Sequence, residues 1–491
     1  MKKIATYTFY LCSVIVCTMI FNTCAYEKGI PDRGEYPDDV GKLIYTKCAT
    51  SGCHTDQSKD AAAGLSLISW NKLFEGGNSG PSVIPYRHDY STLFYYTNHF
   101  SDLGVTLLPT MPFNEAPLSR EEVILLRDWI NSGAPNREGF VKFSDNPSRK
   151  KFYVANQGCD VVTVFDQSTL LPMRYINVFN DAGTQSPHMI RVSPDGQFWY
   201  VTGLAGNYLE KYRTSDDTFV SRALIGSGYW NTFVISSDSQ NAYCVDLSPT
   251  GAKIASVNLT TMAPTIQAGF IFPHGSALNF TNDTLYVTQQ VNSNKLYKIP
   301  IADFSAYSEV NLFTTPPASF INAHEIEFSP DGSKYVVTCQ SSTSPEVRIF
   351  QTINDSLLAI IPVGPLPSEI SFSTSTDYCF ITCTEDTTNF SGKRGSVAVI
   401  NYENNTFVKY IYAGHQPHGV EVDDSKKIVY ISNRNATSDG PAPHHSSACG
   451  GRNGNVSFID LNTLDMVPSE NGYGIKKVEV SVDPYSVAIR H

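Results

Sequence analysis

Charged side chains, positive charge and long apolar runs are all scarce in this chain of 491 residues. Charged residues make up 17% of it, and 36 Lys and Arg stand against 47 Asp and Glu, a formal net charge of −11. This balance disfavours a nucleic-acid partner, which would select a basic face. With 33 Gly, 28 Pro and 12% aromatics, the composition is typical of a β-rich, turn-rich protein, and the length predicts two or more domains.

Several functional motifs are also missing from the sequence. It has no phosphate-binding loop, dinucleotide fingerprint or nucleophile elbow. The eleven cysteines are spread too widely to predict a disulfide scaffold. These absences leave a bound cofactor as the best basis for function.

The one long apolar run lies at the N-terminus, in residues 4–21, after Lys2 and Lys3. A short basic stretch followed by such a run predicts a secretion signal, here residues 1–24, and polar residues interrupt it too often for a membrane span. The run ends in "FNTC". Cys24 is therefore either the lipidated cysteine of a lipoprotein or incidental to an ordinary cleaved signal. In both cases we expect an exported protein, periplasmic or lipid-anchored to the cell envelope.

The stretch "KCATSGCHTD" (47–56) combines Cys48, Cys53 and His54. A zinc knuckle would need two more ligands nearby, and the sequence offers none. A disulfide between the two cysteines would leave His54 unexplained. Covalent haem attachment uses all three residues, with two thioether bonds and a proximal imidazole, although four residues rather than the usual two separate the cysteines.

The flanking sequence supports the haem interpretation. Residues 38–47 and 119–135 predict helices, and the second begins with a capping box of Ser119 and Glu122. Between them, Met111 lies in a proline-rich loop, where a distal thioether ligand would be expected. His88 and His99 are the alternative distal ligands.

Residues 38–136 resemble small monohaem cytochrome c domains through "CATSGCH", "GLSLISWNKLFEGG", "MPF" and "LRDWINSGAP". The resemblance implies a small all-α domain (35–138) with one haem c bound to Cys48 and Cys53. It further implies His54 and Met111 as the axial iron ligands.

A repeat begins after a linker at residues 139–149. Seven short strands centred on Tyr153, Tyr200, Tyr243, Tyr286, Val336, Phe380 and Tyr430 recur every 43 to 50 residues. A period in the forties, with room for four strands, predicts the blades of a propeller.

A second strand begins twelve residues before each of the last six repeats, at His188, Asn231, His274, His324, Ser368 and His418. The first repeat lacks this strand, and the C-terminal segment 483–491, with Tyr485 in the same column, fits the missing position. We therefore expect an all-β seven-bladed propeller (150–491) whose ring is closed by the C-terminal strand. The pattern resembles the YVTN-type propeller family.

Four of the seven column positions are histidine: His188, His274, His324 and His418. Imidazoles around a channel mouth would suit a transition metal or a second cofactor, or would simply form a polar rim joined by hydrogen bonds between blades. The layout resembles nitrous oxide reductases and the nitrite reductases that pair a cytochrome c domain with a propeller, but the histidine sets differ.

A long loop between the last repeats contains His444, His445 and Cys449. These residues are either a copper or zinc site or incidental to a flexible loop. Cys339 and Cys383 occupy matching blade positions and are expected to be buried thiols.

Three functions remain open. The first is an exported electron-transfer protein with one haem, whose propeller docks a redox partner protein. The second is an oxidoreductase with a metal or substrate at the histidine-ringed mouth. The third is a non-catalytic binding propeller.

Overall fold

The computed structural model describes residues 35–491 except 79, 182, 250, 314–318, 444–446, 448 and 470–473. Before the first strand, its regular structure is helical apart from one isolated β-bridge. The helices are α2 (Asp38–Lys47), η1 (Lys59–Ala61), α3 (Trp70–Glu75), η2 (His88–Tyr90), α4 (Thr92–Thr97), η3 (Ser101–Leu103) and α5 (Arg120–Asn131).

The two helices predicted from sequence are present as α2 and α5. Ser119 caps α5 in a reciprocal capping box with Glu122, and Gly133, at a φ of 105°, follows its end. Lys47 at the end of α2 forms an ion pair with Glu122 (Nζ–Oε2 2.7 Å). This pair ties the start of the "CATSGCH" segment to the first turn of α5.

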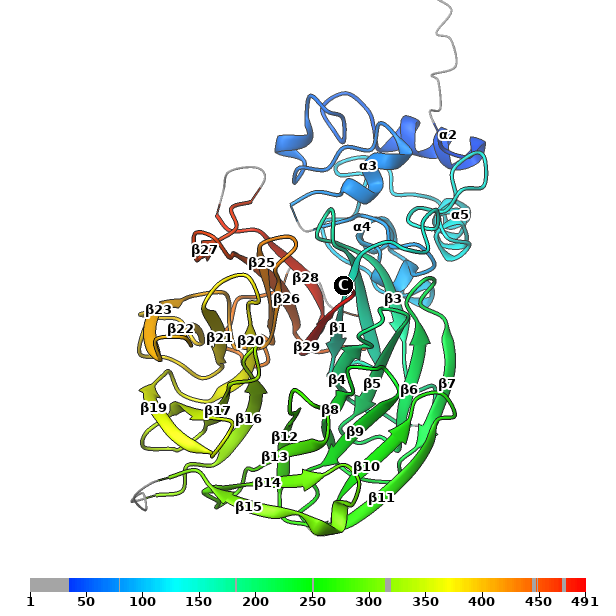
Figure 1. Ribbon diagram of the computed structural model, residues 1–491. Helices are drawn as coiled ribbons and strands as arrows, with labels where there is room; N and C mark the ends of the chain where they lie inside the picture. The colour runs from blue at the N-terminus through cyan, green and yellow to red at the C-terminus, as the bar shows by residue number, and fades with distance from the viewer. Residues whose placement is uncertain are drawn as a thin grey trace, which may run out of the picture.

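The remaining chain forms seven antiparallel sheets arranged in a ring, as Figure 1 shows. Blade 1 contains β29 (Pro484–Ile489), β1 (Lys151–Asn156), β2 (Val161–Asp166) and β3 (Leu171–Asn177). Blade 2 contains β4 (Pro187–Val192), β5 (Phe198–Gly203), β6 (Tyr208–Arg213) and β7 (Phe219–Leu224). Blade 3 contains β8 (Trp230–Ile235), β9 (Asn241–Asp246), β10 (Ala252–Asn258) and β11 (Ala263–Phe270).

Blade 4 contains β12 (Pro273–Leu278), β13 (Thr284–Gln289), β14 (Lys295–Pro300) and β15 (Ser308–Asn311), with η4 (Phe304–Ala306) before its last strand. Blade 5 contains β16 (Ala323–Phe328), β17 (Lys334–Cys339), β18 (Glu346–Gln351) and β19 (Ser356–Pro362). Blade 6 contains β20 (Pro367–Phe372), β21 (Tyr378–Cys383), β22 (Ser396–Asn401) and β23 (Thr406–Ile411). Blade 7 contains β24 (Pro417–Asp423), β25 (Ile428–Asn433), β26 (Asn453–Asp460), β27 (Asp465–Met466) and β28 (Lys477–Val482).

The predicted ring closure is confirmed. The C-terminal strand β29 pairs antiparallel with β1, from Phe152 opposite Ile489 to Asn156 opposite Pro484. The seven column positions all fall on the second residue of an innermost strand. The all-β seven-bladed propeller predicted from the repeat is therefore correct.

The turns between the first two strands of a blade explain the "SPDG" repeats. In blade 2 the Ser193 hydroxyl donates to Asp195 and accepts from the backbone amide of Phe198. Gly196 supplies the positive φ of 69° that the turn requires. Ser329 and Asp331 form the same contact in blade 5, so these motifs are structural turns.

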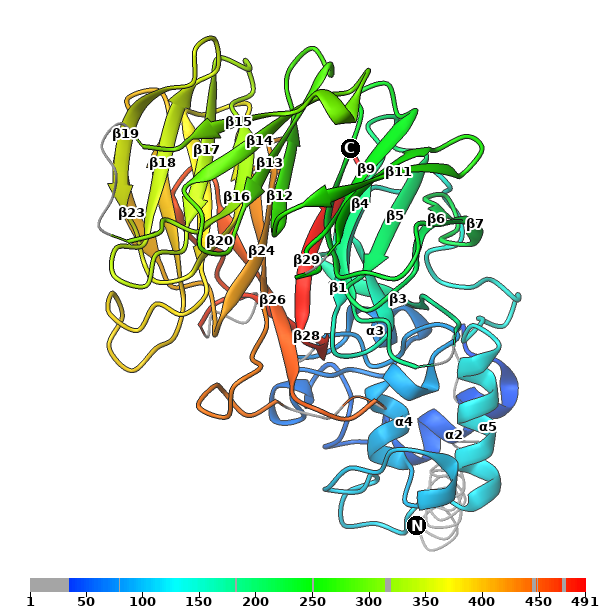
Figure 2. The ribbon, with the colours of Figure 1, turned by 90° about the horizontal axis from the view of Figure 1, so that it is seen from below.

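The helical segment packs against blade 1. Tyr90 stacks on Tyr175, with ring centroids 4.1 Å apart, and Arg87 donates to the Tyr175 carbonyl and to Asn177. One hydrophobic cluster continues from the helices through Phe143 to Tyr153 in blade 1. In Figure 2 the helices lie below the propeller, beside β28 and β3.

Candidate functional site

The "CATSGCH" segment forms a tight loop at the end of α2. Cys48 follows the helix, and its carbonyl accepts from the backbone amide of His54 (3.1 Å). Gly52 adopts a positive φ of 82°, which glycine tolerates and which lets the chain turn back. The loop therefore brings the two thiols and the imidazole to one end of one helix.

The thiols of this loop are not joined to each other. Cys48 is buried, Cys53 is exposed, and both are free. Burial, with a smaller contribution from Cys53, raises the pKa of the Cys48 thiol to about 12. The structure therefore does not show a disulfide between Cys48 and Cys53, one of the interpretations of this motif.

The ring of His54 is oriented by the backbone. Its Nδ1 lies 3.3 Å from the carbonyl oxygen of Leu65. A hydrogen bond from Nδ1–H to a carbonyl fixes the tautomer that leaves the Nε2 lone pair for a ligand. Burial lowers the pKa of His54, partly offset by this hydrogen bond, so the neutral, ligating form is favoured.

Met111 lies in the loop before α5, where its backbone amide donates to the carbonyl of Tyr96 (2.7 Å). Its side chain is half-buried, and the neighbouring Leu108 and Phe113 are 84% and 60% exposed. Large apolar side chains gathered on a surface are typical of a binding face. Both Leu108 and Phe113 lie within three residues of Met111 in the sequence.

The alternative distal ligands have other surroundings. Nδ1 of His88 lies 2.8 Å from the Asn131 side-chain oxygen, and its ring meets Phe94 edge-on. His99 is exposed and packs against Phe100. The hydrogen bond gives His88 a role in joining η2 to α5.

The histidine column forms a second cluster. His188, His274, His324 and His418 are all buried, with 3% to 6% of their surface exposed. Ring centroids lie 4.0 Å apart for His274 and His324, and 3.6 Å apart for His418 and Tyr485. The column is therefore a packed ring of side chains from neighbouring blades.

Hydrogen bonds between blades support this ring, as the structural interpretation predicted. His274 Nδ1 lies 3.1 Å from the His324 carbonyl, and His418 Nδ1 lies 3.2 Å from that of Tyr485. Nδ1 of both His188 and His324 lacks a hydrogen-bond partner among the described residues. Burial lowers the pKa of all four histidines, to about 4 for His274, so they are neutral at pH 7.

Acidic residues that no sequence motif indicated lie in the next layers of the channel. Glu325 follows His324 directly, and Glu369 occupies the same position in blade 6. Burial raises the pKa of both carboxyls, and the pKa of Glu327 and Glu421 to about 7. Aligning the seven innermost strands would have shown these acids one and three positions after the column.

The cysteine in the long loop of blade 7 forms a disulfide and is not free to bind a metal. Cys449 forms a disulfide with Cys159 in the β1–β2 turn, with Cα atoms 6.0 Å apart. The hypothesis that Cys449 ligates a metal is corrected, because its sulfur is already bonded. His444 and His445 lie outside the described residues, as do Cys24 and the predicted signal peptide.

The helical segment contacts the face of the propeller at which the innermost strands begin and on which the histidine column lies. The β1–β2 turn lies beside the residues before β29, since Gln157 donates to the Asp483 carbonyl. Asp160 in this turn accepts from the amide of Ser186, just before β4. Tyr90 of the helical segment reaches Ser481 on the same side (3.4 Å).

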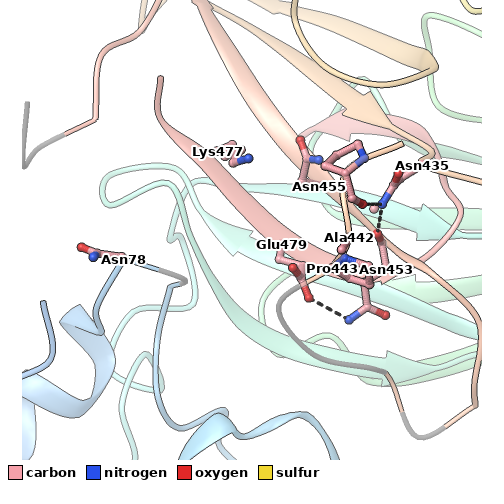
Figure 3. A pocket seen from close by; sticks show the side chains of 10 residues that line it. Asn78, Asn435, Ala442, Pro443, Asn453, Asn455, Lys477 and Glu479 are labelled. Atoms are coloured by element: carbon pink, nitrogen blue, oxygen red, sulfur yellow. Dashed lines mark hydrogen bonds between the residues drawn. The ribbon is translucent and has the colours of Figure 1, made fainter. Parts of the chain in front are cut away.

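A small polar cavity of about 50 Å³ lies where the helical segment approaches blade 7 (Figure 3). Asn78 borders it from the helical side, and Asn453, which donates to Glu479 (3.0 Å), borders it from the propeller. A cavity of this size holds a few water molecules and is far smaller than a cofactor pocket. This cavity is therefore not a candidate cofactor site.

Comparisons with known proteins bear on the fold. No protein-family description and no curated protein matches the sequence. Among solved structures, a chain of Kuenenia stuttgartiensis hydrazine synthase is similar with a TM-score of 0.50 and 14% identity, over 64% of this chain and 92% of that chain. At this identity the similarity supports the propeller fold alone. In the part of the chain that the structure describes, no helix is long and apolar enough to span a bilayer.

Proposed function

We propose that this protein is an exported c-type cytochrome that transfers electrons through one covalently bound haem. Cys48 and Cys53 would form the thioether bonds, and His54 and Met111 would bind the iron. The haem would supply a one-electron redox centre. The helical segment 35–138 would then be a cytochrome c domain, and the propeller would dock a redox partner protein.

The observation that carries this proposal is the orientation of His54. Its Nδ1 faces the Leu65 carbonyl, so Nε2 is the nitrogen left to bind a metal. The two free cysteines of the same loop precede it, one buried in the core and one exposed. A structural histidine would not require two unpaired thiols beside it.

The role of Met111 is supported by its surroundings. The exposed Leu108 and Phe113 flank it and would be covered by a haem face. A thioether ligand opposite an imidazole raises the potential into the range used for electron transfer.

The cellular location is part of the proposal. The disulfide between Cys159 and Cys449 fits an oxidising compartment. We infer export to the periplasm through the N-terminal signal, or attachment to the envelope where cleavage just before Cys24 leaves this cysteine to be lipidated. The net charge of −11 favours a protein partner with a basic face over nucleic acid.

The oxidoreductase alternative is favoured by one arrangement. The helical segment meets the propeller on the face where the histidine column begins, through contacts such as Tyr90 with Ser481. A centre in the channel and a haem would then lie on the same side of the molecule, where electrons could pass between them.

Axial ligation can be tested on the full-length protein matured in a host with haem-attachment machinery. Met111→His should keep a low-spin spectrum and lower the reduction potential, since it replaces a thioether with an imidazole. His99→Ala is the matched control and should leave both unchanged. If Met111→His has no effect while His88→Ala shifts the potential, the assignment of the distal ligand is wrong.

A further inference from the structure

Three buried side chains meet at one side of the propeller channel. His274 is on β12 of blade 4, and His324 and Glu325 are on β16 of blade 5. One ligand atom from each lies within 4.8 Å of the others. All three side chains are at most 6% exposed.

The free atoms of this trio are the ones a metal would use. His274 Nδ1 contacts the His324 carbonyl, which leaves its Nε2 lone pair. Glu325 Oε2 is buried without a hydrogen-bond partner among the described residues, and the His324 ring has only a longer contact with the backbone of Ser368. Buried polar atoms that lack a partner are destabilising, and a bound cation would satisfy them.

The backbone is built to bring these residues close. A β-carbon at Gly275 would lie 2.4 Å from the His324 carbonyl oxygen and 2.7 Å from Glu325 Oε1. Only glycine lets the two innermost strands approach this closely. The Glu325 carboxylate is also positioned, because its Oε1 accepts from the amide of Ile326 (3.1 Å).

We propose that His274, His324 and Glu325 bind one divalent transition-metal cation. Two imidazoles and one carboxylate suit Zn²⁺, Cu²⁺, Ni²⁺ or Fe²⁺, whereas Mg²⁺ and Ca²⁺ prefer oxygen ligands throughout. Three protein ligands leave at least one position for water or a small substrate, the arrangement of a catalytic rather than a structural site. This site is independent of the haem at "CATSGCH".

The rest of the mouth accommodates the added charge. The guanidinium that acts on Glu325 is that of Arg191, which favours a charged carboxylate. Arg434 lies by His188 and His418, is paired with Asp483 (Nε–Oδ1 2.6 Å) and lies over the ring of Tyr485. Its positive charge is thus already neutralised by a carboxylate. Glu369 in the neighbouring blade adds a further buried carboxyl near Glu325.

The test is a metal titration of the full-length protein after chelator treatment. ZnCl₂ followed by calorimetry, and CoCl₂ followed by visible absorption, should each show one tight site. His324→Asn and Glu325→Gln should each weaken zinc binding by about 100-fold or more. Substituting residues that only contact a metal ligand already lowers metal affinity by about 10- to 100-fold. Glu309→Gln is the matched control, with the same substitution on the outermost strand of blade 4, where the carboxylate pairs with Lys295, and should stay within a few-fold of the wild type.

Two further measurements keep the result interpretable. Zinc-edge X-ray absorption on the wild type should show two imidazoles and oxygen ligands at about 2.0 Å. This measurement does not depend on whether any variant folds. A His444→Ala/His445→Ala variant should bind zinc like the wild type. If no tight site is found, or if only this loop variant loses zinc, the proposal is refuted. Failure of haem attachment would leave the zinc titration unchanged.

Discussion

The disulfide between Cys159 and Cys449 should be a main contributor to stability. It joins the β1–β2 turn of blade 1 to the loop before β26 of blade 7. These are the blades that meet where β29 pairs with β1 and closes the ring. The disulfide is therefore a covalent link across a seam that is otherwise held by hydrogen bonds and apolar packing.

The magnitude follows from the length of the closed loop. The two cysteines are 290 residues apart. Loop-closure entropy alone would give about 5 to 6 kcal/mol for such a loop, and measured disulfides mostly contribute about 2 to 5 kcal/mol. We expect Cys159→Ser/Cys449→Ser to lower the free energy of unfolding by about 2 to 5 kcal/mol.

The assay is guanidinium unfolding of wild type and double variant, each with and without reductant. The wild type should lose stability on reduction, and the variant should not respond. Thiol alkylation of the unreduced, denatured wild type should leave Cys159 and Cys449 unlabelled and label Cys339 and Cys383, which are free and buried. Equal unfolding midpoints for the two oxidised proteins, or labelling of all four cysteines, would refute the reasoning.

Three other predictions concern single sites. Ser119→Ala removes the capping box with Glu122 and should cost about 1 kcal/mol in chemical denaturation. In the wild type the buried ammonium of Lys151 lies 2.7 Å from the Asp217 carboxylate. Asp217→Asn removes this counter-ion and should lower the free energy of unfolding by about 3 to 5 kcal/mol, and Lys151→Met/Asp217→Leu should recover most of the loss. Burial by itself would raise the pKa of Asp424. Hydrogen bonds from three hydroxyl groups in the blade 6 turn outweigh this effect and lower the pKa to about 2. Its contribution of about 1 to 2 kcal/mol should be present above pH 4 and lost as the pH falls towards 2, so Asp424→Asn and wild type should differ in stability at pH 6 and converge at pH 2.

The fold could be predicted because its information is local and repeated. The twelve-residue offset between His188 and Tyr200, found in six repeats, is the distance along the chain between corresponding positions of the two paired strands in one hairpin. The closing role of β29 followed from a single missing strand in the first repeat. The capping box at Ser119 similarly lies within four consecutive residues.

The contacts that the sequence did not reveal are those between distant segments. Nothing near Cys159 indicates that it pairs with a cysteine 290 residues away in the loop of blade 7. The position of Glu325 beside His274 depends on how closely two blades pack, which Gly275 allows. The hydrogen bond between His54 and Leu65 likewise depends on how the loop after α2 folds back.

The central claim is that a haem is covalently bound through Cys48 and Cys53. Intact-mass spectrometry of matured, denatured protein, recorded with its absorption spectrum, tests it directly. We predict a mass greater than that of the mature chain by one haem, a Soret band that stays with the protein in denaturant, and loss of both in Cys48→Ser/Cys53→Ser. A colourless protein with the mass of the bare chain would contradict the claim.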